Sequence, residues 1–299
     1  MTPSILNIRE IMKAEFEEKD FEAPLYNELR FGSHRIATPG QVFEGKFGID
    51  AALEAEHPLF WDLFGYYDIP KGVVLDDLRW GFMWRKLGRK RRLPTFNTNL
   101  LIQAKRPIPL SRASSLLKGY GFSSTHWRFE ITEHQQEILE KVSHNLRRKA
   151  LVIYAAPAFH TLDDLYNHTE AQTVVENSTF VKVERLHNHK QWNYYQAGTS
   201  GVAHSEPEFI EDVSLNSMIE QMGGFGQENE NASENLRYLH KMTVEACQEI
   251  QDHNPIAKYY LRLHGRLMRL DELYEIEETI HYSAFNLFCN VAKLKWLVV

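Results

Sequence analysis

Residues 150–156 (ALVIYAA) constrain the fold more than any other segment of the chain. They form an apolar run without a charged side chain, which is typical of a β-strand that is covered on both faces. A sheet with such a strand needs helices packed against both of its sides, so the run predicts an α/β fold. The chain has 299 residues, of which 43% are hydrophobic, and is long enough to bury that sheet.

Helical and extended patterns alternate around this run. Thr132 begins a helix, with Gln135 three residues later completing a capping-box pattern. The expected elements are a helix at 24–35, strands at 47–53 and 98–105, the helix from Thr132, the strand at 150–156 and a hairpin at 179–196. This order favours an α/β sandwich with a mixed sheet.

The pattern changes after residue 222. Residues 223–233 (GGFGQENENAS) are rich in Gly, Asn and Glu and poor in apolar side chains, so they are predicted to form a linker. Apolar residues then recur at helical spacing, and three helices are expected, the later ones around 259–270 and 273–297. The predicted organisation is an α/β domain at 1–222, with an insertion at about 54–97, a linker at 223–233 and a helical appendage at 234–299.

Composition excludes several classes of protein. The formal net charge is −6, so the chain is not a globally basic nucleic-acid binder. No apolar run approaches the roughly 20 residues that cross a bilayer, and the acidic N-terminal stretch lacks a signal-peptide layout. A cytoplasmic protein without a membrane anchor is therefore predicted. Two cysteines are too few for a cysteine-based zinc site, and the 14 histidines lack the spacing of zinc hydrolases, so we interpret them as surface or structural residues.

Polar side chains in two apolar strands suggest a reactive site. Alternation places Gln103 and Lys105 on one face of the 98–105 strand, although both are costly to bury. Asp50 has the same character, because it is a single carboxylate within the apolar segment 47–53. If the two strands are neighbours, Asp50, Gln103 and the carbonyl of Ala104 form an all-oxygen site. Such a site suits Mg²⁺ or Mn²⁺, and Lys105 would orient a water molecule or stabilise developing negative charge.

The segments FGID and LLIQAKRP also suggest a family. Their Gly-x-Asp and Gln-x-Lys motifs resemble the PD-(D/E)xK nuclease superfamily, and especially its Mrr-like restriction branch. The resemblance implies a restriction-endonuclease-like core over residues 24–156, metal ligation by Asp50 and Gln103, and a catalytic role for Lys105. It also implies a further acidic residue, for which Glu44 is the best match and Glu28 the second choice.

The chain departs from this family pattern in one respect. Fifty-two residues separate Asp50 from Gln103, which is more than a simple hairpin needs. Either an insertion supplies substrate contacts, or Asp76 or Asp77 takes the place of Asp50.

A basic stretch within the predicted insertion suggests the substrate. Residues 79–92 (RWGFMWRKLGRKRR) interleave cations with tryptophans, a composition that suits contact with nucleic-acid phosphates. The side chains predicted to bind nucleic acid are Arg79, Arg85, Lys86, Arg89, Lys90, Arg91, Arg92 and Arg106.

These observations lead to a ranked set of functions. The first is a Mg²⁺-dependent endonuclease that cleaves DNA, or RNA, and that the resemblance associates with anti-phage defence. The second is a catalytically silent nucleic-acid-binding or scaffold subunit of a larger complex, and the third is a metal-dependent phosphatase. Control of a nuclease by self-assembly or by a regulatory protein partner is also expected, because uncontrolled cleavage would damage the host genome.

Overall fold

The computed structural model describes residues 13–32, 99–123, 125–223, 232–269 and 277–298. These residues group into two compact units. The first unit takes the described residues within 13–32, 102–140 and 152–218, and the second takes those within 99–101, 141–151 and 219–298. Among the described helices, none is long and apolar enough to cross a membrane.

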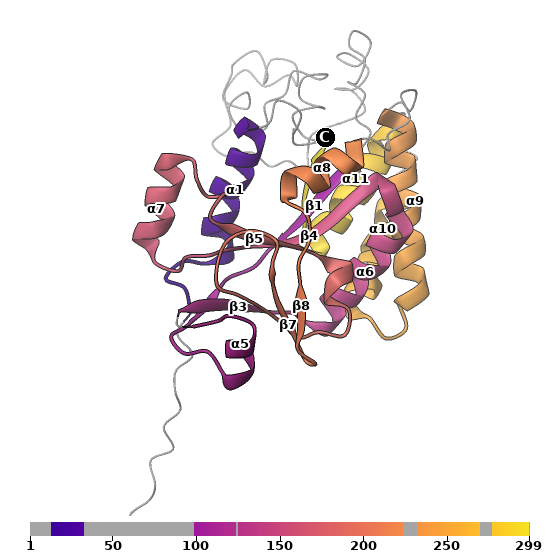
Figure 1. Ribbon diagram of the computed structural model, residues 1–299. Helices are drawn as coiled ribbons and strands as arrows, with labels where there is room; N and C mark the ends of the chain where they lie inside the picture. Colours follow the sequence, from indigo (N-terminus) through magenta and orange to yellow (C-terminus); the bar gives the residue numbers. More distant parts are fainter. Residues whose placement is uncertain (1–12, 33–98, 124, 224–231, 270–276, 299) are drawn as a thin grey trace, which may run out of the picture. The chain divides into compact units, whose positions relative to one another are not determined.

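The helices and strands follow one another along the chain as labelled in Figure 1. In the first half they are α1 (Glu18–Gly32), β1 (Asn99–Ala104), β2 (Ile108–Leu110), α5 (Ser115–Gly119), β3 (His126–Glu130), α6 (Glu133–Leu146), η3 (Arg147–Lys149) and β4 (Ala150–Pro157). They continue with α7 (Leu162–Ala171), β5 (Ser178–Lys182), η4 (Val183–Leu186), β6 (Gln191–Tyr194), β7 (Gly201–His204), β8 (Glu208–Ile210), α8 (Leu215–Gly223), α9 (Ala232–Ile250), α10 (Pro255–Met268), α11 (Glu277–Val291) and β9 (Lys295–Val298).

A four-stranded sheet with the order β5-β4-β1-β9 contains the two apolar strands predicted from the sequence. Every residue of β1 and β4 is buried, as expected for strands that are covered on both faces. The Asn99 side chain donates to the Lys149 carbonyl, and the Lys105 N–H donates to the Ala155 carbonyl. Because this offset is the same at both ends, β1 and β4 are parallel, whereas β5 pairs with β4 antiparallel. The predicted α/β class with a mixed sheet is confirmed.

A second sheet, β2-β3-β6-β7-β8, was not expected from the sequence and is antiparallel throughout. It shows that the predicted hairpin at 179–196 is wrong. β5 pairs with β4 in the first sheet, whereas β6 pairs with β3 and β7 in the second. Between them the chain turns through η4, where Val183 and Leu186 are buried, so the two strands pack in different layers.

Two predicted helix boundaries also need correction. α1 begins at Glu18, not at residue 24, and Pro24 lies inside the helix. Asp20 accepts a hydrogen bond from the Glu17 N–H at 2.8 Å, which stabilises this earlier start. At the other end of the chain, α11 ends at Val291 and is followed by β9 rather than by more helix. Lys293 has a positive φ of 56° and ends the helical path.

Asn99 connects three parts of the second unit. Its amide Nδ2 donates to the Lys149 carbonyl at 2.9 Å and to Asn235 Oδ1 at 3.3 Å. Its Oδ1 accepts a hydrogen bond from Trp296 Nε1 at 2.9 Å. One fully buried carboxamide therefore joins the beginning of β1 to η3, α9 and β9.

We predict that Asn99→Ala lowers the free energy of unfolding by about 2–4 kcal/mol, because buried groups on three partners lose this hydrogen bond. Urea unfolding followed by circular dichroism measures the change. Asn27→Ala, at an exposed position of α1, is the matched control and should change stability by less than about 0.5 kcal/mol. Equal effects of the two substitutions would show that the Asn99 bonds contribute nothing.

Candidate functional site

The residues predicted at the end of β1 meet a third polar residue, Gln135 of α6. The apolar face of α6 carries Ile138, Val142 and Leu146, all of which are buried. Gln135 precedes Ile138 by one turn on that same face, so packing of the helix carries its amide into the interior. Only 7% of Gln135 is exposed, and a buried amide requires hydrogen-bond partners.

Gln135 binds both predicted site residues of β1. Its Nε2 donates to Gln103 Oε1 at 2.7 Å, and its Oε1 accepts a hydrogen bond from Lys105 Nζ at 2.7 Å. Gln103 is 1% exposed and Lys105 is 7% exposed. The structure therefore brings Gln103 and Lys105 together through one amide, and both side chains are held in fixed orientations.

The Tyr154 ring forms one wall of this site. Lys105 Nζ lies 5.3 Å from the ring centroid, within the range of a cation–π contact. The phenol O–H donates to Gln136 Oε1 at 2.7 Å. Burial, and next the charge of Glu140, raise the pKa of Tyr154 well above its usual range, so the phenol stays neutral beside the lysine.

Gln136 connects this wall to a surface pocket. Its Nε2 donates to Glu140 Oε1 at 2.5 Å and to the Val183 carbonyl at 2.8 Å. Glu140 Oε2 lies 2.8 Å from Nδ1 of His187, whose side chain is exposed. The pocket has a volume of about 560 Å³ and is lined by Ile131, Glu133, Gln136, Glu137, Glu140, His187, Asn188, His189 and Lys190.

The described part of the site offers neutral oxygen donors for a metal ion. Gln103 Nε2 donates to the Ala104 carbonyl at 3.2 Å, which leaves the Gln103 Oε1 turned toward Gln135. A carbonyl oxygen has two lone pairs, so Oε1 can accept this bond and also bind a cation. Among the described residues, no group of three or more His, Cys, Asp or Glu side chains is arranged to hold a metal ion. The charged ligand predicted here, Asp50, lies outside the described residues, as does Glu44.

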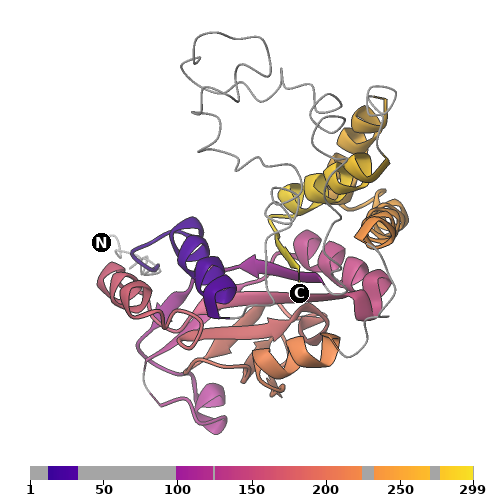
Figure 2. The same ribbon diagram turned by 90° about the horizontal axis from the view of Figure 1, so that it is seen from above.

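Glu28, the second choice for the acidic ligand, has a structural contact. Its carboxylate accepts hydrogen bonds from the N–H groups of Val174 at 2.6 Å and Val175 at 3.1 Å. It thereby attaches α1 to the segment that follows α7, and the two helices lie side by side in Figure 2. A metal ion at Glu28 would compete with these two bonds.

Arg106 is the one residue of the predicted nucleic-acid interface that lies in the described residues. Its Nη1 is 2.6 Å from Glu17 Oε1, and its Nη2 donates to the Ala14 carbonyl. These contacts attach the segment before α1 to the end of β1. The basic stretch 79–92, with Arg79, Arg85, Lys86, Arg89, Lys90, Arg91 and Arg92, lies outside the described residues.

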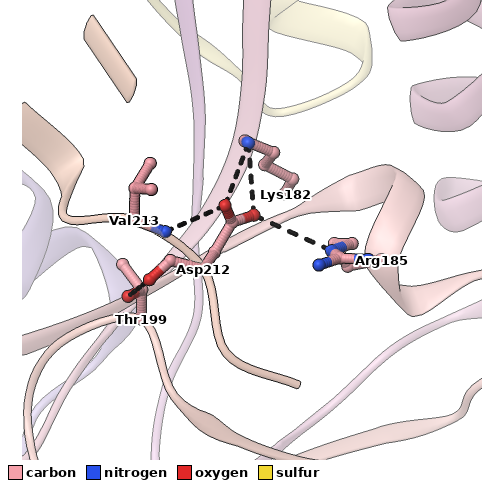
Figure 3. A network of polar contacts seen from close by, with 5 residues as sticks. All are labelled: Lys182, Arg185, Thr199, Asp212 and Val213. Carbon is pink, nitrogen blue, oxygen red and sulfur yellow. Dashed lines mark hydrogen bonds and ion pairs between the residues drawn. The ribbon is translucent and has the colours of Figure 1, made fainter. Parts of the chain in front are cut away.

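A separate cluster of charges surrounds Asp212 and serves a structural role (Figure 3). Lys182 Nζ lies 3.2 Å from both carboxylate oxygens of Asp212, and Arg185 Nε lies 3.8 Å from Oδ2. The Thr199 hydroxyl donates to the Asp212 backbone carbonyl at 2.7 Å, and the Val213 N–H donates to Oδ1 at 3.0 Å. The carboxylate is therefore neutralised by its neighbours and fixes the end of β5 to the segment after β8.

Gln135 and Tyr154 are the residues of this site that sequence reasoning did not assign to it. Gln135 was interpreted as part of a capping box, but its side chain binds Gln103 and Lys105. The available signal was a polar residue on an otherwise apolar helix face, which marks a side chain that needs a buried partner. Tyr154 gave no separate signal because it fits the apolar run of β4.

Comparisons with known proteins assign no function to this arrangement. No protein-family model, curated protein or solved structure matches the chain. The function therefore has to be inferred from the residues themselves.

We predict that Lys105 and Gln135 are energetically coupled. Lys105→Met and Gln135→Leu should each lower the free energy of unfolding by about 1.5–3 kcal/mol, and the double variant should lose about 1–3 kcal/mol less than the sum, because one bond is removed twice. Urea unfolding of the four proteins measures this coupling. Lys105→Met combined with Gln251→Ala, at an exposed position, should be additive. Additivity of Lys105 with Gln135 would contradict the hydrogen bond described above.

Proposed function

We propose that the chain is a Mg²⁺- or Mn²⁺-dependent nuclease that hydrolyses phosphodiester bonds of DNA. The observation that carries this proposal is the pairing of buried Gln103 and Lys105 at the end of a central strand, with both side chains bound to Gln135. Burial of an ammonium group and two amides is costly and adds little to a hydrophobic core, so a functional reason for it is favoured. The Gln-x-Lys motif of the PD-(D/E)xK superfamily supports the same conclusion.

The donor set supports a hard divalent cation as the cofactor. Asp50, Gln103 and the Ala104 carbonyl would hold it, and Glu44 is favoured over Glu28 as a further acid because Glu28 already binds two backbone N–H groups. A divalent ion supplies a strong nucleophile from water at neutral pH and neutralises phosphate charge. Lys105 Nζ orients the attacking water or stabilises the charge that develops on the phosphoryl oxygen. Water oxygen bonds to phosphorus, one P–O bond breaks, and the departing strand end takes up a proton.

A restriction-endonuclease-like core belongs to the same proposal. The parallel pair β1 and β4, with α6 between them in the chain, fits the helix–strand order expected of that core. A role in anti-phage defence follows only from the resemblance. The proposal also includes regulation by a second copy or a protein partner, because a nuclease without control would cleave its host's DNA.

The alternative is a catalytically silent subunit that binds nucleic acid or serves as a scaffold. The observation that favours it is that Lys105 Nζ and the Glu28 carboxylate both take part in internal hydrogen bonds. Such bonds would give these polar residues a purely structural purpose.

We predict that the purified chain cleaves plasmid or linear DNA with Mg²⁺ or Mn²⁺ and that EDTA stops the reaction. Lys105→Ala should reduce the cleavage rate by about 100-fold or more, since the group that stabilises the reacting phosphate is lost. Gel assays with DNA and RNA in parallel measure the rate and the substrate preference. Lys241→Ala, at an exposed position of α9, is the matched control and should retain the full rate.

Two outcomes would contradict the nuclease proposal. Equal cleavage by the original chain and by folded Lys105→Ala would assign the activity to a contaminant. Binding that weakens steeply with salt but never produces cleavage would support the silent subunit instead.

A further inference from the structure

Three histidines meet between the helices of the second unit. His240 comes from α9, His264 from α10 and His281 from α11, and these three helices pack against one another. His240 Nε2 lies 2.7 Å from His264 Nε2, and His240 Nδ1 lies 2.8 Å from His281 Nδ1. We call these residues the histidine trio. Both ring nitrogens of its central member are used, one toward each neighbouring helix.

The trio is held in its neutral form. His240 is 8% exposed, and its pKa is lowered to about 4 by burial, by His264 and by His281. Burial also lowers the pKa of His264. At neutral pH, each N···N contact therefore consists of one ring N–H that donates to a bare ring nitrogen.

Proton counting limits how much charge this arrangement tolerates. Each of the two contacts needs one proton between its nitrogens. Three neutral imidazoles carry three protons, which supply both contacts and one of the two outer nitrogens. A fourth proton is accommodated on the remaining outer nitrogen. A fifth has to enter a contact, where two N–H groups would then face each other, and that contact breaks.

The same geometry argues against a single metal ion. The two nitrogens of His240 point to opposite sides of its ring, so His264 and His281 approach different atoms. Two nitrogen ligands of one tetrahedral zinc lie about 3.3 Å apart, given Zn–N bonds of about 2.0–2.1 Å. The observed separations of 2.7 and 2.8 Å are those of hydrogen bonds.

The other ionisable groups near the trio do not titrate in the acidic range. The Tyr260 ring lies 5.7 Å from His264, and burial raises the pKa of Tyr260 above its usual range. Cys247 and Cys289 act on Tyr260, and burial raises the pKa values of these thiols too, so they stay neutral. On the surface of α9, Lys241 is paired with Glu245. In the described residues, the causes of the lowered pKa of His240 are burial and the trio itself.

We propose that the histidine trio is a pH-sensitive latch that joins α9, α10 and α11 at neutral pH and releases them on acidification. Protonation breaks N···N contacts and places positive charge among packed helices. This proposal stands independently of the nuclease function.

The pH window follows from the direction of the pKa shift. A histidine whose pKa is lower in the folded state binds fewer protons there than in the open state. Its contribution to stability is therefore complete above the unfolded pKa of about 6.5 and is lost as the pH falls toward about 4. Because each pKa unit is a factor of ten, the opening equilibrium should rise by up to about 300-fold across this window.

Hydrogen exchange of the full chain tests the latch. Exchange of peptides from α9, α10 and α11 is measured between pH 7 and pH 4 and corrected for the intrinsic rate. Their opening equilibrium should rise by more than about 100-fold in the original chain, and by less than about 10-fold in His240→Gln, whose amide does not titrate. His253→Gln, at an exposed position after α9, is the matched control and should behave like the original chain.

The histidine ring signals of the original chain give a second measurement that needs no variant to fold. One ring signal should titrate well below pH 6, in step with the loss of protection in the three helices. Ordinary titration of all three rings near pH 6.5, or unchanged protection down to pH 4, would overturn the latch. Binding of one equivalent of Zn²⁺ that shifts all three ring signals would also overturn it, in favour of a metal site.

Discussion

The complete burial of β1 is the constraint on which much of the structure depends. A central strand without exposed residues contains Asn99 and Gln103 and is followed by buried Lys105, and each of these polar groups must find a partner inside the protein. Asn99 meets this requirement through η3, α9 and β9. Gln103 and Lys105 meet it through Gln135 of α6. The position of that helix is therefore fixed by polar contacts as well as by its apolar face.

Hydrophobic pattern was sufficient to predict the central elements and insufficient for the edges. β4 and β1 are long apolar runs, and α6 has one apolar face, so local sequence specifies them. The strands of the second sheet have three to five residues and mixed burial, which leaves little periodic signal. The hairpin at 179–196 failed because strands that are close in sequence pair in different sheets, and that choice depends on tertiary packing.

The candidate sites show the same division. Gln103 and Lys105 were predicted because polar residues at alternate positions of an apolar strand demand an explanation. Their partner Gln135 was assigned to a cap, since sequence spacing cannot distinguish a helix-terminal glutamine from one that reaches another element. The histidine trio carried no signal at all. Its members are 24 and 17 residues apart, and only the packing of three helices brings the rings together.

The hydrogen bonds of Asn99 have a consequence for how the chain acquires its structure during synthesis. They join residues that are 50, 136 and 197 positions apart. At about 5–20 residues per second, Trp296 follows Asn99 from the ribosome after about 10–40 s. Until β9 arrives, one side of β1 has no neighbouring strand, and an apolar edge of this kind invites pairing with other chains. Nascent chains that pause before residue 295 are therefore the species most exposed to aggregation and most dependent on chaperones.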